Sequence, residues 1–309
     1  MSLRSLLSFF LLSTAGYFPC RVLAQQLSKE QLIYLTSEWK GERFPDGRPK
    51  IPDDLIRRAR NIGTEDAWNI LNNEGYHCQF EGGWKTITDS PIVGRALTAC
   101  FIPSRPDLEK SIKDKGKKEG RIGNTNSWPI DALSKGDVYV ADGFGKIAGG
   151  TLIGDNLGNS IYARSGNGVV FDASARDLEG LSEIAGFNAF VRDWDPTYLK
   201  DEMLIGLNTP IRIGHAVVLP GDLVLARREG VVFIPAHLAE KVIVNAEFIA
   251  RKDAFGISRL KEGRYTPGQI DNEWTDAIKN DFLQWLSQQP EKVIMTREQL
   301  DGFLQKRTW

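Results

Sequence analysis

The sequence predicts an α/β fold with helical extensions before and after its core, and three observations support this fold class. A strand, a helix and a second strand follow one another within about thirty residues in the middle of the chain (138–172). Shorter apolar runs separated by turn residues come next (211–234), and the segments on either side of the core have helical periodicity. The composition, 41% apolar and 26% charged, is typical of a globular protein that buries a sizeable core.

The first 24 residues have the pattern of a secretory signal peptide. Arg4 precedes an apolar run from Leu6 to Phe18, and Val22-Leu23-Ala24 supplies small residues for cleavage. We therefore expect an exported protein, periplasmic or secreted, with no membrane attachment after cleavage. An uncleaved anchor is the alternative, but the run is short for a membrane span. Cleavage removes two arginines and no acid, which changes the net charge from −1 to −3, so a nucleic-acid partner is not expected.

Residues 25–88 are predicted to form an N-terminal helical segment. Pro52 to Ala59 has acidic residues where the dipole of a first helical turn favours them. Thr64 to Leu71 is predicted as a second helix with Thr64 as its N-cap.

The α/β core is predicted to span residues 89–245. It begins with a strand from Ile92 to Ile102 that ends at Pro103, and the Lys- and Glu-rich stretch 109–121 is predicted as a solvated helix or loop. The strands expected between residues 211 and 234 suggest a mixed β layer, because only short turns separate them. Further strands are expected at 138–142, 169–172, 211–213, 216–219, 223–225 and 231–234, and helices at 152–164 and from 177.

Residues 246–309 are predicted to form a C-terminal helical extension for packing or oligomerisation. Apolar residues recur at helical spacing from Ile270 to Trp285, and Thr296-Arg297-Glu298-Gln299 has the form of a capping box.

The few cysteines and histidines limit which disulfides and zinc sites the chain can form. Export would permit a disulfide between Cys78 and Cys100. The favoured alternative is that Cys100, inside an apolar strand, is a buried free thiol. The chain has only three histidines and they are scattered, which argues against a histidine-rich zinc site.

Three charged residues are candidates for a functional site. Asp155 follows the loop after the first strand of the strand-helix-strand unit, and Arg176 and Asp177 follow its second strand. Parallel strands end at the same edge of a sheet, where ligands bind in such folds. The three side chains can therefore converge, although twenty residues separate Asp155 from Arg176.

Their chemistry suits an anion and a metal. The Asp177 carboxylate can hold a hard divalent ion that keeps most of its waters, as Mg²⁺ does. Arg176 offers a planar fork for a carboxylate or enolate oxygen. Backbone N–H groups at the helix start, Gly154 to Leu157, suit an anion, and Asp155 can orient a water or move a proton. The alternative is structural: two helix-start acids and an arginine in a surface ion pair.

Five stretches together resemble the RraA-like family, which includes class II 4-hydroxy-4-methyl-2-oxoglutarate/4-carboxy-4-hydroxy-2-oxoadipate aldolases. Aldolases of this family have an Asp, twenty intervening residues and then Arg-Asp, a spacing that this chain matches. The stretches are Gly149 to Leu157, Gly168 to Asp172, Arg176-Asp177, Pro220 to Ala226 and Glu229 to Pro235.

The resemblance covers roughly residues 53–242 and implies a swivelling β/β/α fold assembled as a homotrimer or homohexamer. It implies a divalent metal (Mg²⁺, Mn²⁺ or another) on Asp177, Asp155 and Arg176 as catalytic residues, and a small 2-oxo acid as substrate. The substrate-binding residues implied are Gly154, Asp155, Asn156, Leu157 and Arg176. The activity implied is retro-aldol cleavage of a 4-hydroxy-2-oxo acid with release of pyruvate, together with decarboxylation of oxaloacetate.

One departure from the family and two other functions remain open. The family often has Asp-Gly before Arg-Asp, whereas this chain has Asp172-Ala173-Ser174-Ala175, which we expect to reshape the substrate side of the pocket. The second function is a non-catalytic exported binding protein, because some RraA-like proteins are regulators. The third is a Rossmann-type NAD oxidoreductase, because Gly143-Phe144-Gly145 follows a strand and Asp172 ends the next one.

Overall fold

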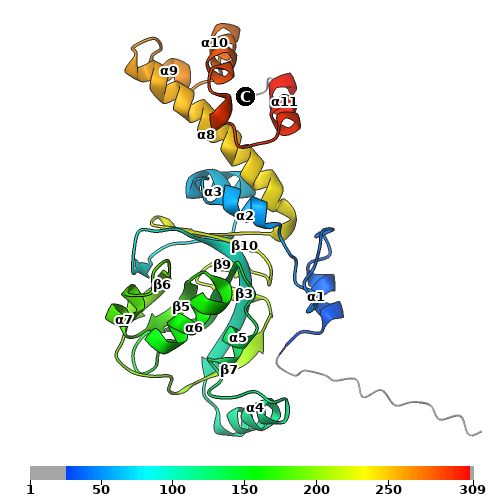
Figure 1. The fold of residues 1–309 in the computed structure, drawn as a ribbon, viewed down its shortest axis with the longest axis vertical. Coiled ribbons are helices and arrows are strands. Elements are labelled where there is room, and N and C mark those ends of the chain that lie inside the picture. The colour runs from blue at the N-terminus through cyan, green and yellow to red at the C-terminus, as the bar shows by residue number, and fades with distance from the viewer. Residues whose placement is uncertain (1–25, 307–309) are drawn as a thin grey trace, which may run out of the picture.

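The computed structural model describes residues 26–306, and its central feature is a nine-stranded sheet with helices packed on it (Figure 1). The strand order is β1-β11-β10-β3-β4-β5-β6-β2, and β7 pairs with β3 as a branch. A separate two-stranded sheet contains β8 (Ile211–Ile213) and β9 (Ala216–Val218). The strands of the main sheet are β1 (Phe80–Glu81), β2 (Lys85–Thr86), β3 (Ile92–Pro103), β4 (Asp137–Lys146), β5 (Val169–Ala175), β6 (Ala189–Trp194), β7 (Glu202–Leu207), β10 (Leu223–Arg227) and β11 (Gly230–Ile234).

Four neighbouring strands, β3 to β6, run parallel, which confirms the parallel pairing predicted from the strand-helix-strand unit. Successive residues of β4 face opposite sides of the sheet. Tyr139 and Ala141 pack into one hydrophobic cluster, whereas Val138 and Val140 pack into another. Because both faces are covered, the strand sequence is apolar without alternation. The strands β7, β10 and β11 pair antiparallel with their neighbours, which gives the mixed β layer expected.

Helices cover the two faces of the sheet. Helices α4 to α7 contribute to the cluster around Tyr139, and α6 and α7 are the connections from β4 to β5 and from β5 to β6. Helices α2, α3 and the start of α8 pack together around β10 and β11. The helices before α8 are α1 (Lys29–Leu35), α2 (Asp53–Ala59), α3 (Thr64–Asn73), α4 (Pro106–Lys118), α5 (Trp128–Asp131), α6 (Asp155–Ser165), α7 (Leu178–Ser182) and the 3₁₀ turn η1 (Ala236–Leu238).

The helical C-terminal extension is present. Helix α8 (Ala239–Lys261) begins on the sheet and carries the chain away from it to the last helices (Figure 1). There Phe255 and Phe282 are buried with Trp274 and Ile278, so the predicted helical spacing does form a packed face. The remaining elements are α9 (Pro267–Ile270), α10 (Asp276–Ser287), the 3₁₀ turn η2 (Pro290–Lys292) and α11 (Arg297–Lys306).

The structure bears on several local predictions. The capping box is confirmed, because the Gln299 N–H donates to Thr296 Oγ1 (3.2 Å) and the Thr296 N–H donates to Gln299 Oε1 (3.1 Å). The N-cap of α3 is Gly63 and not Thr64, which is the first helical residue and makes no side-chain cap. Cys78 and Cys100 are free thiols, which confirms that part of the favoured interpretation, but Cys100 is only half-buried in β3.

Some elements were not predicted, one predicted boundary falls inside a helix, and one predicted segment lies outside the described residues. Strands β6 and β7 had no prediction, and neither had β1 and β2, which lie within the predicted helical segment 25–88. The Lys- and Glu-rich stretch, predicted as a helix or loop, forms α4. The predicted boundary between residues 245 and 246 falls inside α8, so one continuous helix joins the core to the extension. The predicted signal peptide, residues 1–24, lies outside the described residues. Within residues 26–306, no helix is both long and apolar enough to cross a membrane.

Candidate functional site

Two loops meet where β4 and β5 end. Helix α6 begins at Asp155 after the loop that leaves β4, and Arg176 directly follows β5. The Arg176 N–H donates to the Ile153 carbonyl (3.0 Å), which fixes the second loop against the first. The sequence prediction that these segments converge is therefore correct in geometry.

Gly154 allows the closest approach between the two loops. A Cβ at this position would lie 2.9 Å from Arg176 Cζ and would overlap Asp177 Oδ2. The backbone of Gly154 (φ −127°, ψ −167°) is extended and open to any residue, so the requirement for glycine is one of space. The predicted loop residue Gly154 thus lies directly against both charged groups.

Arg176 and Asp177 form an ion pair on the surface of the single chain. Arg176 Nη1 lies 2.6 Å from Asp177 Oδ2, and the two side chains are 35% and 34% exposed. Asp177 is the N-cap of α7 and has a left-handed backbone (φ 58°, ψ 46°), a conformation that Asp tolerates better than most residues. Both charged ends are therefore open to a ligand that approaches from solvent.

Asp155 begins α6 on the same side. Its Oδ1 accepts the N–H of Asn156 (2.7 Å), so this N–H, which we expected to be available to an anion, is already occupied. The Asp155 carboxylate packs over Gly180 in the first turn after Asp177, because a Cβ on Gly180 would lie 2.9 Å from Asp155 Oδ2. Asn156 is exposed, and Leu157 is half-buried against the core.

The donor set fits a hydrated divalent ion with one protein ligand. Within residues 26–306 no group of three His, Cys, Asp or Glu side chains is placed to enclose a metal ion. Asp177 uses Oδ2 for Arg176, and no hydrogen bond from the described residues reaches Oδ1. A partly exposed carboxylate with one uncommitted oxygen suits an ion such as Mg²⁺ that keeps several waters.

Buried hydrogen bonds that we did not predict hold the first loop in place. The Asn126 amide donates to the Leu152 carbonyl (2.6 Å), and both groups are buried. The single hydroxyl proton of Ser174, which is fully buried in β5, is shared between the carbonyls of Ile147 (Oγ···O 2.7 Å) and Gly150 (3.1 Å). Asn126 lies far from the loop in sequence, so no local pattern points to it. In the sequence, Ser174 was noted only because it lies in the segment that departs from the family pattern.

The segment that departs from the family lies inside the sheet. Ala173 is 2% exposed, and a Cβ on Gly143 would lie 2.6 Å from its Cβ, so Gly143 provides the space that Ala173 needs. Gly143 lies where the register between β4 and β5 shifts, and β4 continues to Lys146. These glycines therefore form an irregular strand and not a strand-to-helix turn.

Asp172 likewise has a structural partner. Its Oδ1 lies 2.6 Å from Arg192 Nε, and the carboxylate is 5% exposed. It is therefore not available to bind a ribose, and the dinucleotide-binding alternative loses its structural basis.

Comparisons with known proteins place the fold and the family. The model of the RraA-like family, described as Aldolase/RraA, matches residues 64–233. A Halalkalibacterium halodurans protein with the provisional name 4-hydroxy-4-methyl-2-oxoglutarate aldolase is 32% identical over 37% of this chain and 53% of its own length. The 4-hydroxy-4-methyl-2-oxoglutarate aldolase of Thermus thermophilus is 27% identical over 42% of this chain and 83% of its own. An uncharacterised Methanocaldococcus jannaschii protein matches over 46% of its length, so the alignment spans about half of two of these relatives.

Solved structures agree in fold. An uncharacterised protein from Pseudomonas syringae pv. tomato superposes with a TM-score of 0.59 at 21% identity, covering 72% of this chain and 100% of its own. Streptomyces coelicolor RraAS2, described as an unusual member of the RNase ES inhibitor RraA protein family, superposes with a TM-score of 0.55 at 22% identity, covering 69% and 98%. Because the family model covers more than half of the 309 residues, this chain belongs to the RraA-like family.

Proposed function

We propose that this protein is a divalent-metal-dependent lyase that cleaves a 4-hydroxy-2-oxo acid by a retro-aldol reaction and releases pyruvate. The observation that carries the proposal is the contact of Gly154 with Arg176 and Asp177 where two parallel strands end. Two relatives named as aldolases support the reaction class.

Each residue has a role that its position supports. Arg176 would bind the carboxylate or keto oxygen of the substrate through its guanidinium group, which is one-third exposed. Asp177 would hold the metal through the oxygen that Arg176 leaves uncommitted, and Asp155 would position a water for proton transfer. A bound divalent ion would supply positive charge that stabilises the enolate oxygen formed during cleavage. The start of α6, with Gly154, Asp155, Asn156 and Leu157, would complete the substrate site beside Arg176.

The bond changes balance without a redox partner. The proton of the C4 hydroxyl leaves to water, and the O–H electron pair forms a C4=O double bond, so that C4 leaves in the second product as a carbonyl carbon. The C3–C4 bond breaks, and its electron pair stays on C3 as the pyruvate enolate. Arg176 stabilises the developing negative charge, and the water held by Asp155 returns a proton to C3. Oxaloacetate would give the same enolate by losing CO₂.

A non-catalytic binding role is the second candidate. The structural match to a protein described as belonging to an RNase inhibitor family favours it. The 2.6 Å pair between Arg176 and Asp177 is also compatible with a purely structural role for both residues.

Assembly and location belong to the same proposal. The site lies on the open surface of one chain, so a neighbouring subunit of a homotrimer or homohexamer would exclude water from it. Export to the periplasm or the exterior rests on the pattern of residues 1–24.

The test is a coupled assay of pyruvate release with Mg²⁺ and a panel of 4-hydroxy-2-oxo acids and oxaloacetate. We expect turnover that disappears on metal chelation and in Asp177→Ala, falls in Arg176→Lys, and is unchanged in Glu298→Gln, an exposed acid on α11. If the wild type releases no pyruvate, and the wild type and Asp177→Ala bind the oxo acids equally well, the lyase proposal fails and the binding role is favoured.

A further inference from the structure

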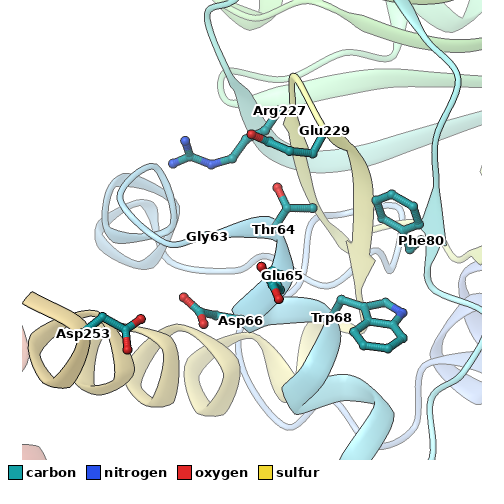
Figure 2. A pocket seen from close by; sticks show the side chains of 9 residues that line it. All are labelled: Gly63, Thr64, Glu65, Asp66, Trp68, Phe80, Arg227, Glu229 and Asp253. Carbon is teal, nitrogen blue, oxygen red and sulfur yellow. The ribbon is translucent and has the colours of Figure 1, made fainter. Parts of the chain in front are cut away.

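A second site lies far along the chain from Arg176 and Asp177, in a cavity of about 690 Å³ between α3, α8 and the turn that joins β10 to β11. Its volume is in the range of pockets that hold small molecules. Figure 2 shows side chains from all three elements around the space. The lining residues are Gly63, Thr64, Glu65, Asp66, Trp68, Phe80, Arg227, Glu229 and Asp253.

The charge of this lining is strongly negative. Four carboxylates, Glu65, Asp66, Glu229 and Asp253, face one cation, Arg227. Arg227 donates from Nη2 to a backbone carbonyl of the chain before α3 (2.5 Å), so part of its hydrogen-bonding capacity is already used. The pocket therefore carries an excess of three negative charges over its single cation.

Two of these carboxylates, Asp66 and Asp253, have raised pKa values. Burial together with the charges of Asp253 and Glu65 raises the pKa of Asp66 above its ordinary value. Burial also raises the pKa of Asp253, while Lys252 opposes and Glu65 adds to this effect. The Lys252 ammonium group lies over the Trp274 ring, 4.9 Å from its centroid, and not among the lining residues.

A second observation independent of charge points to a ligand. Thr64 is 7% exposed, and its Oγ1 is buried without a hydrogen-bond partner among the described residues. In Figure 2 this hydroxyl is directed from α3 toward the side of the pocket where Arg227 and Glu229 lie. A buried hydroxyl without a partner is costly, and a polar group bound in the cavity would remove that cost.

The apolar part of the lining narrows the ligand class. Trp68 is 40% exposed although it is a large aromatic residue, and Phe80 is half-buried on the neighbouring strand β1. Aromatic faces attract cations as well as apolar groups. In the described part of the chain no three acidic or histidine side chains are close enough to share one metal ion, so the separated carboxylates suit an extended organic cation better.

We propose that this pocket binds a small organic amine. Its ammonium group lies against Asp66 and Asp253, a polar group on its body meets the Thr64 hydroxyl, and its apolar part rests on Trp68 and Phe80. The site is separate from the proposed lyase reaction and does not depend on it.

The experiment uses the full chain and isothermal titration calorimetry with 2-phenylethylamine, and with 2-phenylethanol as the matched neutral probe. We expect saturable binding of the amine, at least tenfold weaker binding of the alcohol, and weaker amine binding at high salt, because the carboxylates are partly exposed (a charged hydrogen bond commonly changes affinity by about tenfold or more). Equal binding of both probes, or no saturable binding of the amine, would overturn the proposal.

Variants locate the binding. Asp66→Asn and Asp253→Asn are each expected to weaken amine binding by about tenfold, whereas Glu298→Gln leaves it unchanged. Asp253 is exposed on α8, so Asp253→Asn folds even if the change at the half-buried Asp66 lowers stability. Binding that is lost equally in Glu298→Gln, or retained in both pocket variants, would show that the amine binds elsewhere. Pyruvate release in Asp253→Asn stays at the wild-type rate whichever way the binding experiment ends.

Discussion

Replacing Gly154 with alanine is the sharpest test of the proposed lyase site, because it adds one methyl group and changes no charge. That methyl would lie 2.9 Å from Arg176 Cζ, whereas ordinary contacts begin at 3.4 Å, so the guanidinium must retreat by about 0.5 Å. The Asp177 carboxylate, which the methyl would overlap, must move further. Misplacement of catalytic groups by about 1 Å commonly costs about 100-fold in rate, equivalent to about 2.7 kcal/mol in the activation free energy.

Stability is expected to change little in the same variant. The extended backbone of Gly154 accepts alanine without strain, and the displaced ion pair is one-third exposed. Exposed pairs contribute at most about 1 kcal/mol to the free energy of unfolding. The melting temperature should therefore fall by no more than about 4 °C.

The assay compares kcat/KM for pyruvate release with thermal unfolding followed by circular dichroism. Gly268→Ala is the matched control, because a Cβ on this exposed glycine of α9 meets no atom within 4 Å. If Gly154→Ala keeps wild-type activity, the contact between the two loops does not position catalytic groups. If activity and stability collapse together, the glycine has a folding role and the reasoning also fails.

Three further predictions concern groups that the structure buries wholly or in part. Ser174→Ala leaves the carbonyls of Ile147 and Gly150 without the hydroxyl donor that they share, so we expect a loss of about 1–3 kcal/mol in urea unfolding and a lower rate of pyruvate release. Burial, with a smaller effect of the Asp142 charge, raises the pKa of the Cys100 thiol to about 11, so at pH 8 a thiol reagent should modify exposed Cys78 quickly and Cys100 only slowly. Burial raises the pKa of Asp222 to about 7, above its unfolded value, so its contribution to stability is complete below about pH 4 and is lost as the pH rises to about 7.

Each of these has a result that contradicts it. A Ser174→Ala protein with unchanged urea midpoint would mean that the loop carbonyls find other donors. Equal modification rates for the two cysteines would show that the strand around Cys100 opens readily. For Asp222 the measured quantity is the difference in unfolding free energy between wild type and Asp222→Asn from pH 4 to pH 8, expected to change by about 4 kcal/mol. A constant difference across this range would refute the raised pKa.

Much of the fold could be predicted because the core strands have strong local patterns. Val138 to Ala141 is apolar at every position, which is what a parallel strand covered on both faces requires. Strand β6 was not predicted because Arg192 and Asp193 interrupt its apolar residues. In the structure these two charged side chains pair with Asp172 and Lys85, which lie far away in sequence. Strand β7 pairs with the C-terminal half of β3. This pairing joins segments about a hundred residues apart, so no local sequence pattern predicts it.

The position of the candidate site could be predicted in part, because it follows from the order of strands and helices. Asp155, Arg176 and Asp177 each follow a strand or begin a helix, so parallel topology alone brings them to one edge. Supporting contacts do not follow from topology. Asn126 is far from Leu152 in sequence, and the engagement of the Asn156 N–H by Asp155 depends on side-chain rotamers.

The left-handed backbone of Asp177 has a consequence for how function can change within such a fold. Asn and Gly adopt this conformation as readily as Asp, so either could replace it without strain in the first turn of α7. Both replacements would remove the carboxylate. If Asp177 holds a metal as proposed, a descendant could lose that metal by a single substitution at almost no cost in folding, and the intact surface could then be selected for binding alone.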